Sequence, residues 1–127
     1  MEDNSYQINI IYGEIASLNS QIRQNDEKIE RLERAYRNIG DKQDQYFDNK
    51  RYIQKPQLTG NLWRGKHAER FLERRDDLED IYMRVGNQNI QNMLDRIKEE
   101  IERYSKINRN LNNSISNKRS RIEQLRN

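Results

Sequence analysis

Residues 8–39 read INIIYGEIASLNSQIRQNDEKIERLERAYRNI, and this stretch decides the fold. Its apolar residues recur alternately three and four positions apart. One set of positions, spaced by seven, holds Ile8, Ile15, Ile22, Ile29, Tyr36, Gln43 and Lys50. A companion set, three residues further on, holds Ile11, Leu18, Asn25, Leu32, Ile39, Tyr46 and Ile53. This heptad repeat predicts a long helix that buries one narrow apolar seam against another helix.

Three residues interrupt the regularity of this first helix. Asn25 is polar, and a polar residue in a seam often fixes register or partner choice at some cost in stability. The simpler alternative is that a hydrated stretch tolerates it, and the sequence leaves both interpretations open. Gly13 and Gly40 weaken the helix locally, each by about 1 kcal/mol relative to alanine.

The composition of the whole chain agrees with a seam and not with a globular core. Of 127 residues, 35% are charged and 32% are apolar, whereas roughly 45–50% apolar residues are usual in globular domains. The 24 basic and 21 acidic residues are interspersed and leave a net charge of +3. That mixture is typical of a solvated helix surface and gives only weak support for a nucleic-acid partner, so we expect none and keep binding through the basic clusters as a third, weaker alternative.

Several classes of protein are disfavoured by what the sequence lacks. It contains no cysteine, so neither disulfides nor cysteine-ligated metals are expected. No segment is apolar enough to span a membrane, and the first residues do not resemble a signal peptide. The single histidine, His67, lies among basic residues, and we interpret it as an exposed residue near a helix start. The acidic run Asp76, Asp77, Glu79 and Asp80 lacks the spacing of a calcium loop. We therefore expect no enzyme, no metal site and no cofactor.

A second periodic stretch follows a turn-rich segment that contains the only proline, Pro56. We expect Phe71, Leu78, Tyr82 and Val85 to share one face. After Gly86 the pattern resumes in a shifted phase, which predicts a stutter, a kink or a short break there. The resumed seam consists of Ile90, Leu94, Ile97, Ile101, Tyr104, Asn108, Leu111, Ile115, Lys118, Ile122 and Leu125.

These segments together predict an all-α protein, an elongated antiparallel helical hairpin with coiled-coil-like packing. We expect a single domain over residues 1–127, with arm 1 at about 4–53, the loop at 54–62 and arm 2 at about 63–126, kinked near Gly86. A pair of helices buries little surface and gains stability from further helices. A helical partner is therefore expected to cover the remaining apolar flank, which includes Tyr12, Tyr52 and Met83.

The start of the second arm differs from ordinary coiled-coil sequence. Residues 62–71 read LWRGKHAERF and hold the only tryptophan, Trp63, with Gly65 two residues later. Ala68 and Phe71 are spaced to lie on one helical face, and the glycine suggests that Trp63 packs against bare backbone. Trp63 could plug the end of the hairpin, or it could contact a partner, since tryptophan is enriched at binding hot spots. We take Leu62, Trp63, Gly65, Ala68 and Phe71 as candidate protein-binding residues.

A Trp-x-Gly element at the bend of a helical hairpin resembles the WxG superfamily of small proteins exported by type VII secretion. The string Pro56-Gln57-Leu58, Trp63-Arg64-Gly65-Lys66-His67-Ala68 and Phe71 is similar, more closely, to the YwqH-like family. That resemblance implies a Gram-positive accessory protein, cytoplasmic or exported with its toxin, that binds the helical N-terminal domain of an LXG toxin. It further implies contact with the secretion machinery and leaves room for a second small helical accessory protein.

One feature of such substrates is missing from this sequence. The export element Tyr-x-x-x-Asp/Glu does not occur, because Tyr104 is followed four residues later by Asn108 and Tyr82 by Gly86. The resemblance then implies that the partner carries any such signal, or that this chain is a chaperone and not itself a substrate. The alternative function, independent of the resemblance, is a self-associating structural coiled-coil scaffold with no secretion role.

Overall fold

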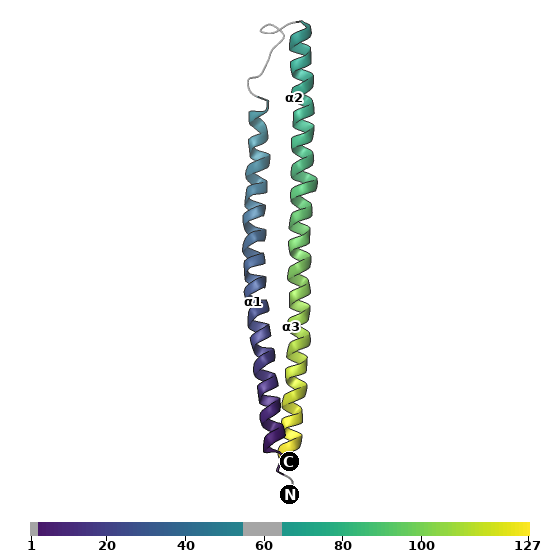
Figure 1. Ribbon diagram of the computed structural model, residues 1–127. Helices are drawn as coiled ribbons and strands as arrows, with labels where there is room; N and C mark the ends of the chain where they lie inside the picture. The colour runs from purple at the N-terminus through teal and green to yellow at the C-terminus, as the bar shows by residue number, and fades with distance from the viewer. Residues whose placement is uncertain (1–2, 55–64) are drawn as a thin grey trace. The chain divides into compact units, whose positions relative to one another are not determined.

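The structure, a computed structural model, describes residues 3–54 and 65–127. Helix α1 covers Ser5–Asp48 and continues into a 3₁₀ turn, η1, at Asn49–Tyr52. Helix α2 covers Lys66–Arg84, a π-helical segment, η2, covers Val85–Ile90, and α3 covers Gln91–Arg126. No strand occurs among the described residues (Figure 1). The all-α helical-hairpin fold expected from the heptads is therefore confirmed.

The chain divides into two compact units. We call Met1–Arg34 with Lys98–Asn127 the terminal unit, and Ala35–Ile97 the central unit. Each unit is an antiparallel pair. In the terminal unit the side-chain amide of Asn4 donates to the carbonyl oxygen of Leu125 at 2.9 Å, so the start of α1 lies beside the end of α3 (Figure 1). In the central unit the ammonium of Lys50 lies 3.1 Å from the carboxylate of Glu79.

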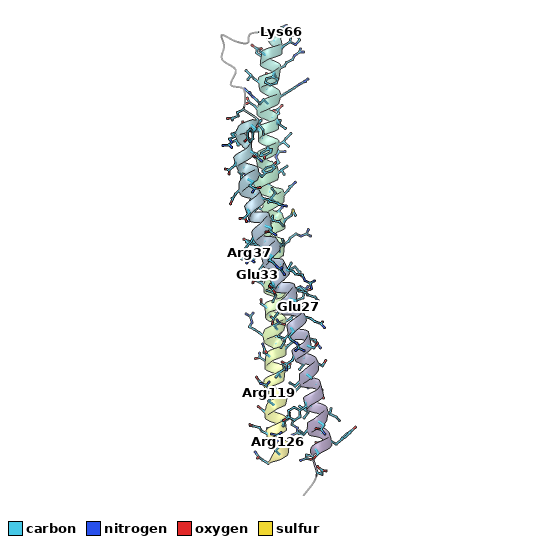
Figure 2. All side chains as sticks on the ribbon, turned by 90° about the vertical axis from the view of Figure 1, so that its left-hand side faces the viewer. Glu27, Glu33, Arg37, Lys66, Arg119 and Arg126 are labelled. Atoms are coloured by element: carbon cyan, nitrogen blue, oxygen red, sulfur yellow. The ribbon has the colours of Figure 1, made fainter. Side chains whose placement is uncertain are left out.

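An isoleucine cluster holds the terminal unit together. Ile15, Ile115 and Ile122 are 6%, 4% and 3% exposed. Half-buried apolar residues pack against them, namely Ile8, Ile11, Leu18 and Ile22. Charged side chains of this unit, such as Glu27 and Arg119, project from the helices (Figure 2). The predicted seams of α1 and α3 are thus confirmed, since all their residues are at least half-buried except Tyr36, which is 37% exposed.

A polar layer crosses the terminal unit at Asn25. Its side-chain amide donates to the Oδ1 of Asn108 at 2.9 Å, and the amide of Asn108 donates to the carboxylate of Asp26 at 2.9 Å. Asn108 is buried, at 8% exposure. A buried amide with both groups bonded across a helix pair is stable only in one register. This geometry supports the register interpretation of Asn25 over simple tolerance.

The inward face of α2 differs from the sequence-based expectation. Phe71 and Leu78 are exposed, and only Tyr82 and Val85 of the expected set are half-buried. The buried and half-buried residues between Ala68 and Gly86 are Ala68, Leu72, Arg75, Glu79, Tyr82, Met83, Val85 and Gly86. Arg75 and Glu79 hold inward positions because their aliphatic stems can pack while their charged groups stay near water. A prediction based on hydrophobicity alone therefore chose a face of α2 next to the one that is buried.

The break expected near Gly86 is a π-helical segment and not a turn, because η2 connects α2 to α3 without leaving the helical conformation. A Cβ on Gly86 would lie 2.5 Å from Cε1 and 2.7 Å from Cζ of Phe47. The glycine therefore permits close approach of the Phe47 ring. The side-chain amide of Gln43 donates to the carbonyl oxygen of Gly86 at 2.9 Å, which fixes this segment against α1.

Candidate protein-binding surface

An apolar stripe runs along an exposed flank of α2, beside the face that packs on α1. Leu78 and Ile81 are 52% and 53% exposed, and Phe71, one heptad before Leu78, is 42% exposed. Positions i, i+7 and i+10 lie on one side of a helix. We call Phe71, Leu78 and Ile81 the α2 stripe. Apolar residues gathered on one helix face are typical of a surface that contacts another protein.

The side of α2 that faces α1 is held by polar and aromatic contacts, which leave the α2 stripe outside. Gln54 donates to the carboxylate of Glu79 at 2.7 Å, and with Lys50 this lowers the pKa of Glu79 below its ordinary value. The rings of Tyr46 and Tyr82 are stacked, with centroids 3.7 Å apart and planes 5° from parallel. The Tyr82 hydroxyl donates to the carbonyl oxygen of Tyr46. Burial, followed by the charge of Tyr82, raises the pKa of Tyr46.

The start of α2 explains one of the predicted site residues. Gly65 has φ 102° and ψ −179°, a backbone region open essentially to glycine alone. Its carbonyl oxygen accepts the first helical hydrogen bond, from the amide of Glu69 at 3.1 Å. No atom of the described residues lies within 4 Å of where a Cβ would be. The backbone conformation therefore requires a glycine here, and the expected packing of Trp63 against it stays a prediction, because Trp63 lies outside the described residues.

The other predicted site residues have different positions. Ala68 is buried, at 5% exposure, whereas Phe71 is on the exposed side with the guanidinium of Arg75 5.5 Å from its ring centre. Ala68 and Phe71 therefore differ in exposure although they are one turn apart. Leu62 and Trp63 lie outside the described residues. Their predicted role in binding stays a prediction.

Two residues of the expected apolar flank are exposed, and one is not. Tyr12 is 45% and Tyr52 is 56% exposed, while Met83 is half-buried. The guanidinium of Arg126 donates to the Tyr12 hydroxyl at 2.7 Å, which partly covers that ring. Ile81 was not recognised from the sequence, although its spacing of three from Leu78 is a signal that could have identified it.

Over residues 3–54 and 65–127, no three His, Asp or Glu side chains gather closely enough to hold a metal ion. No helix in the same ranges combines the length and apolarity needed to cross a membrane.

These features define a class: an all-α protein of antiparallel helix pairs with an apolar stripe on an outer helix face. A family model described as YwqH-like matches residues 7–127. The chain therefore belongs to the YwqH-like family. No curated protein and no solved structure matches it.

Proposed function

We propose that this chain is an accessory protein of type VII secretion that binds the helical N-terminal domain of an LXG toxin and helps present it for export. The role is one of binding and not of catalysis. The family membership supports the secretion context, since the YwqH-like match covers nearly the whole chain. The α2 stripe supports the mode of binding.

The observation that carries the proposal is the exposure of Leu78 and Ile81, which are 52% and 53% exposed on one side of α2. A partner helix laid along this face would bury both side chains and continue toward Phe71, as in helix-in-groove recognition. Burying an exposed leucine or isoleucine side chain completely is worth roughly 1.5–3 kcal/mol. Both side chains are already about half covered, so each is expected to contribute about half of that range.

A second observation makes a helical partner favourable. No large side chain in the described part of the chain is fully buried. Helix pairs with so shallow a seam gain much of their stability from additional packing. A ligand that binds only the folded chain also raises its apparent stability. The free protein is therefore expected to be helical but only modestly stable.

The test is co-expression with the N-terminal domain of the LXG toxin encoded beside this chain, followed by copurification. The double variant Leu78→Ser/Ile81→Ser is expected to recover at least tenfold less domain than the wild type. The matched control is Tyr6→Ser/Ile10→Ser, which removes two exposed apolar residues of the terminal unit, 77% and 45% exposed. Circular dichroism of both variants establishes that they remain helical.

The outcomes separate the proposal from its rival. If the wild type recovers no LXG domain and purifies only with copies of itself, the protein is a self-associating scaffold instead. If the control loses the domain and the α2 variant keeps it, binding lies on the terminal unit. Trp63→Ala, tested in the same way, shows whether the Trp-x-Gly element takes part in the contact.

A further inference from the structure

The π-helical segment changes how the two sides of the central unit meet. Inward positions on the second side are Tyr82, Gly86, Ile90 and Leu94, each four residues after the last, where a heptad would alternate three and four. A π-helical turn takes up about one extra residue. Helix α1 keeps the ordinary alternation at Tyr36, Ile39, Gln43 and Tyr46. The extra residue is therefore taken up in η2, and Leu94 follows on the same buried side as Tyr82 and Gly86.

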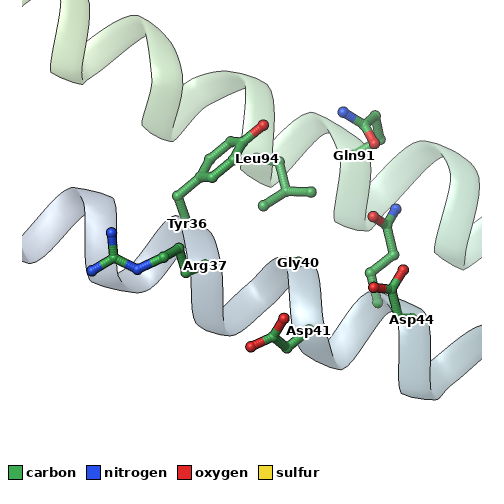
Figure 3. Close-up of a pocket in the computed structure, with 8 residues that line it drawn as sticks. Tyr36, Arg37, Gly40, Asp41, Asp44, Gln91 and Leu94 are labelled. Atoms are coloured by element: carbon green, nitrogen blue, oxygen red, sulfur yellow. The ribbon is translucent and has the colours of Figure 1, made fainter.

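A hollow of about 420 Å³ lies on the central unit between α1 and the first turn of α3, directly after η2. Leu94, only 4% exposed, lies on one side of it and Tyr36 on another, with Gln91 from α3 at the rim (Figure 3). Gly40 contributes no side chain, and nothing lies within 4 Å of where its Cβ would be. The amide of Gln43 is already bonded to Gly86. The open space beside Gly40 is therefore bounded by the Tyr36 ring, the edge of Leu94 and helix backbone, with polar side chains around its margin.

Charges at helical spacing run along one side of this hollow. Arg37, Asp41 and Asp44 occupy positions i, i+4 and i+7 of α1, with the base at one end and the two acids at the other (Figure 3). In the part of the chain that the structure describes, none of the three takes part in an ion pair. A stripe of about two helical turns matches another helix better than it matches a small molecule.

We infer that the hollow beside Gly40 receives one large apolar side chain from a helix of the partner protein. That helix carries a lysine or arginine within a turn of the inserted residue, on the side facing Asp41 and Asp44. Charge complementarity selects this occupant, because a base pairs with the two acids and an acid at the other end pairs with Arg37. The inserted residue acts as a knob in a hole that this chain does not fill itself.

This inference rests on the proposed function, and it is tested with the full chain and the N-terminal domain of the neighbouring LXG toxin by isothermal titration calorimetry. Gly40→Leu fills the hollow. The matched control is Gly13→Leu, at the other α1 glycine with nothing within 4 Å of its Cβ position. Both changes replace glycine by a better helix former, so both variants should fold. Gly40→Leu is expected to weaken binding at least tenfold and Gly13→Leu less than twofold.

A charge reversal tests the predicted basic residue. Asp41→Lys/Asp44→Lys is expected to weaken binding, with a loss that shrinks at high salt because screening weakens exposed charge contacts. Its control, Glu99→Lys/Glu102→Lys, has the same spacing at two exposed positions of the terminal unit. Equal losses in both reversals would show a nonspecific charge effect and overturn the inference.

Three further outcomes separate a failure of the proposed function from a failure of the inference. A wild type that binds no LXG domain removes the proposed function, and the inference with it. A wild type that binds, with Gly40→Leu unchanged, overturns the inference alone. If Gly40→Leu abolishes only self-association, measured by sedimentation, while the LXG domain still binds, a second copy occupies the hollow and the inference is wrong.

Discussion

The terminal and central units share a heptad repeat, but different kinds of side chain occupy their inward positions. The terminal unit buries three isoleucines and one hydrogen-bonded asparagine layer. In the central unit, Leu94 is the one large apolar side chain that is buried among the described residues. There, stacked tyrosines, a Lys50–Glu79 ion pair and a π-helical segment take the place of aliphatic layers. Both units expose apolar side chains, but the central unit buries fewer of them and carries a hollow of about 420 Å³ beside Gly40.

The largest expected effect tests whether the isoleucine cluster carries the terminal unit. Ile115→Ala removes a buried side chain and should lower the free energy of unfolding by about 2–5 kcal/mol. That is a large share of the roughly 5–15 kcal/mol typical of a domain. Chemical denaturation followed by circular dichroism measures it. Ile10→Ala, at a site 45% exposed, is the control, and an equal loss there would contradict the special role of the cluster.

Substitutions in the polar layer of the terminal unit are expected to have the next largest effect on stability. Asn108→Ala leaves the Asn25 amide without its cross-helix acceptor and should cost about 1–3 kcal/mol. Asn25→Leu/Asn108→Leu removes both partners and should be at least as stable as the wild type, because no buried polar group is stranded. Thermal melts compare the two variants. If the double variant is the less stable, the layer contributes stability and not only register.

Gly86 of the central unit and Gly13 of the terminal unit should respond to alanine in opposite directions. Gly86→Ala places a methyl group against the Phe47 ring and forces that ring to move, so it should cost about 1 kcal/mol, at the lower end for overpacking. Gly13→Ala has open space around it and should raise stability by up to about 1 kcal/mol. Thermal midpoints provide the comparison. A rise for both variants would show that η2 does not need its glycine.

The smallest effect concerns acid sensitivity in the central unit. The pKa of Glu79 is lowered from its ordinary value of 4.5, chiefly by the hydrogen bond from Gln54 and then by Lys50. A lowered folded-state pKa stabilises the fold above the unfolded-state value, and this contribution is lost as pH falls through the folded-state pKa. The difference in thermal midpoint between wild type and Glu79→Gln should therefore shrink from pH 7 to pH 3. A difference in thermal midpoint that stays constant between pH 7 and pH 3 would contradict the lowered pKa of Glu79.

The sequence predicted the terminal unit better than the central one, for a physical reason. In α1 and α3 the inward positions are mostly isoleucine and leucine, so hydrophobic periodicity identified them directly. In α2 the inward face includes Arg75 and Glu79 while Leu78 points outward, and the same criterion selected Phe71 and Leu78. The shift at Gly86 was visible as a change of phase, but its π-helical form was not.

Other features depend on how two helices pair, which the sequence of a single helix does not contain. The pairing of Asn25 with Asn108 requires the register between segments 83 residues apart. The hollow beside Gly40 depends on how the side chains of two helices are positioned relative to each other. No sequence motif therefore predicts it. The positive φ of Gly65 is a backbone property that the sequence motif did not predict.

Hydrogen–deuterium exchange, with and without the LXG N-terminal domain, tests the contrast between the units most directly. In the free protein, amides of residues 5–34 and 98–126 should exchange more slowly than those of 66–97, because the terminal unit has the better-filled core. On binding, the gain in protection should be greatest in α2 and in α1 around Gly40. Equal exchange in the free units, together with protection confined to the terminal unit on binding, would contradict the assignment of the central unit as the binding region.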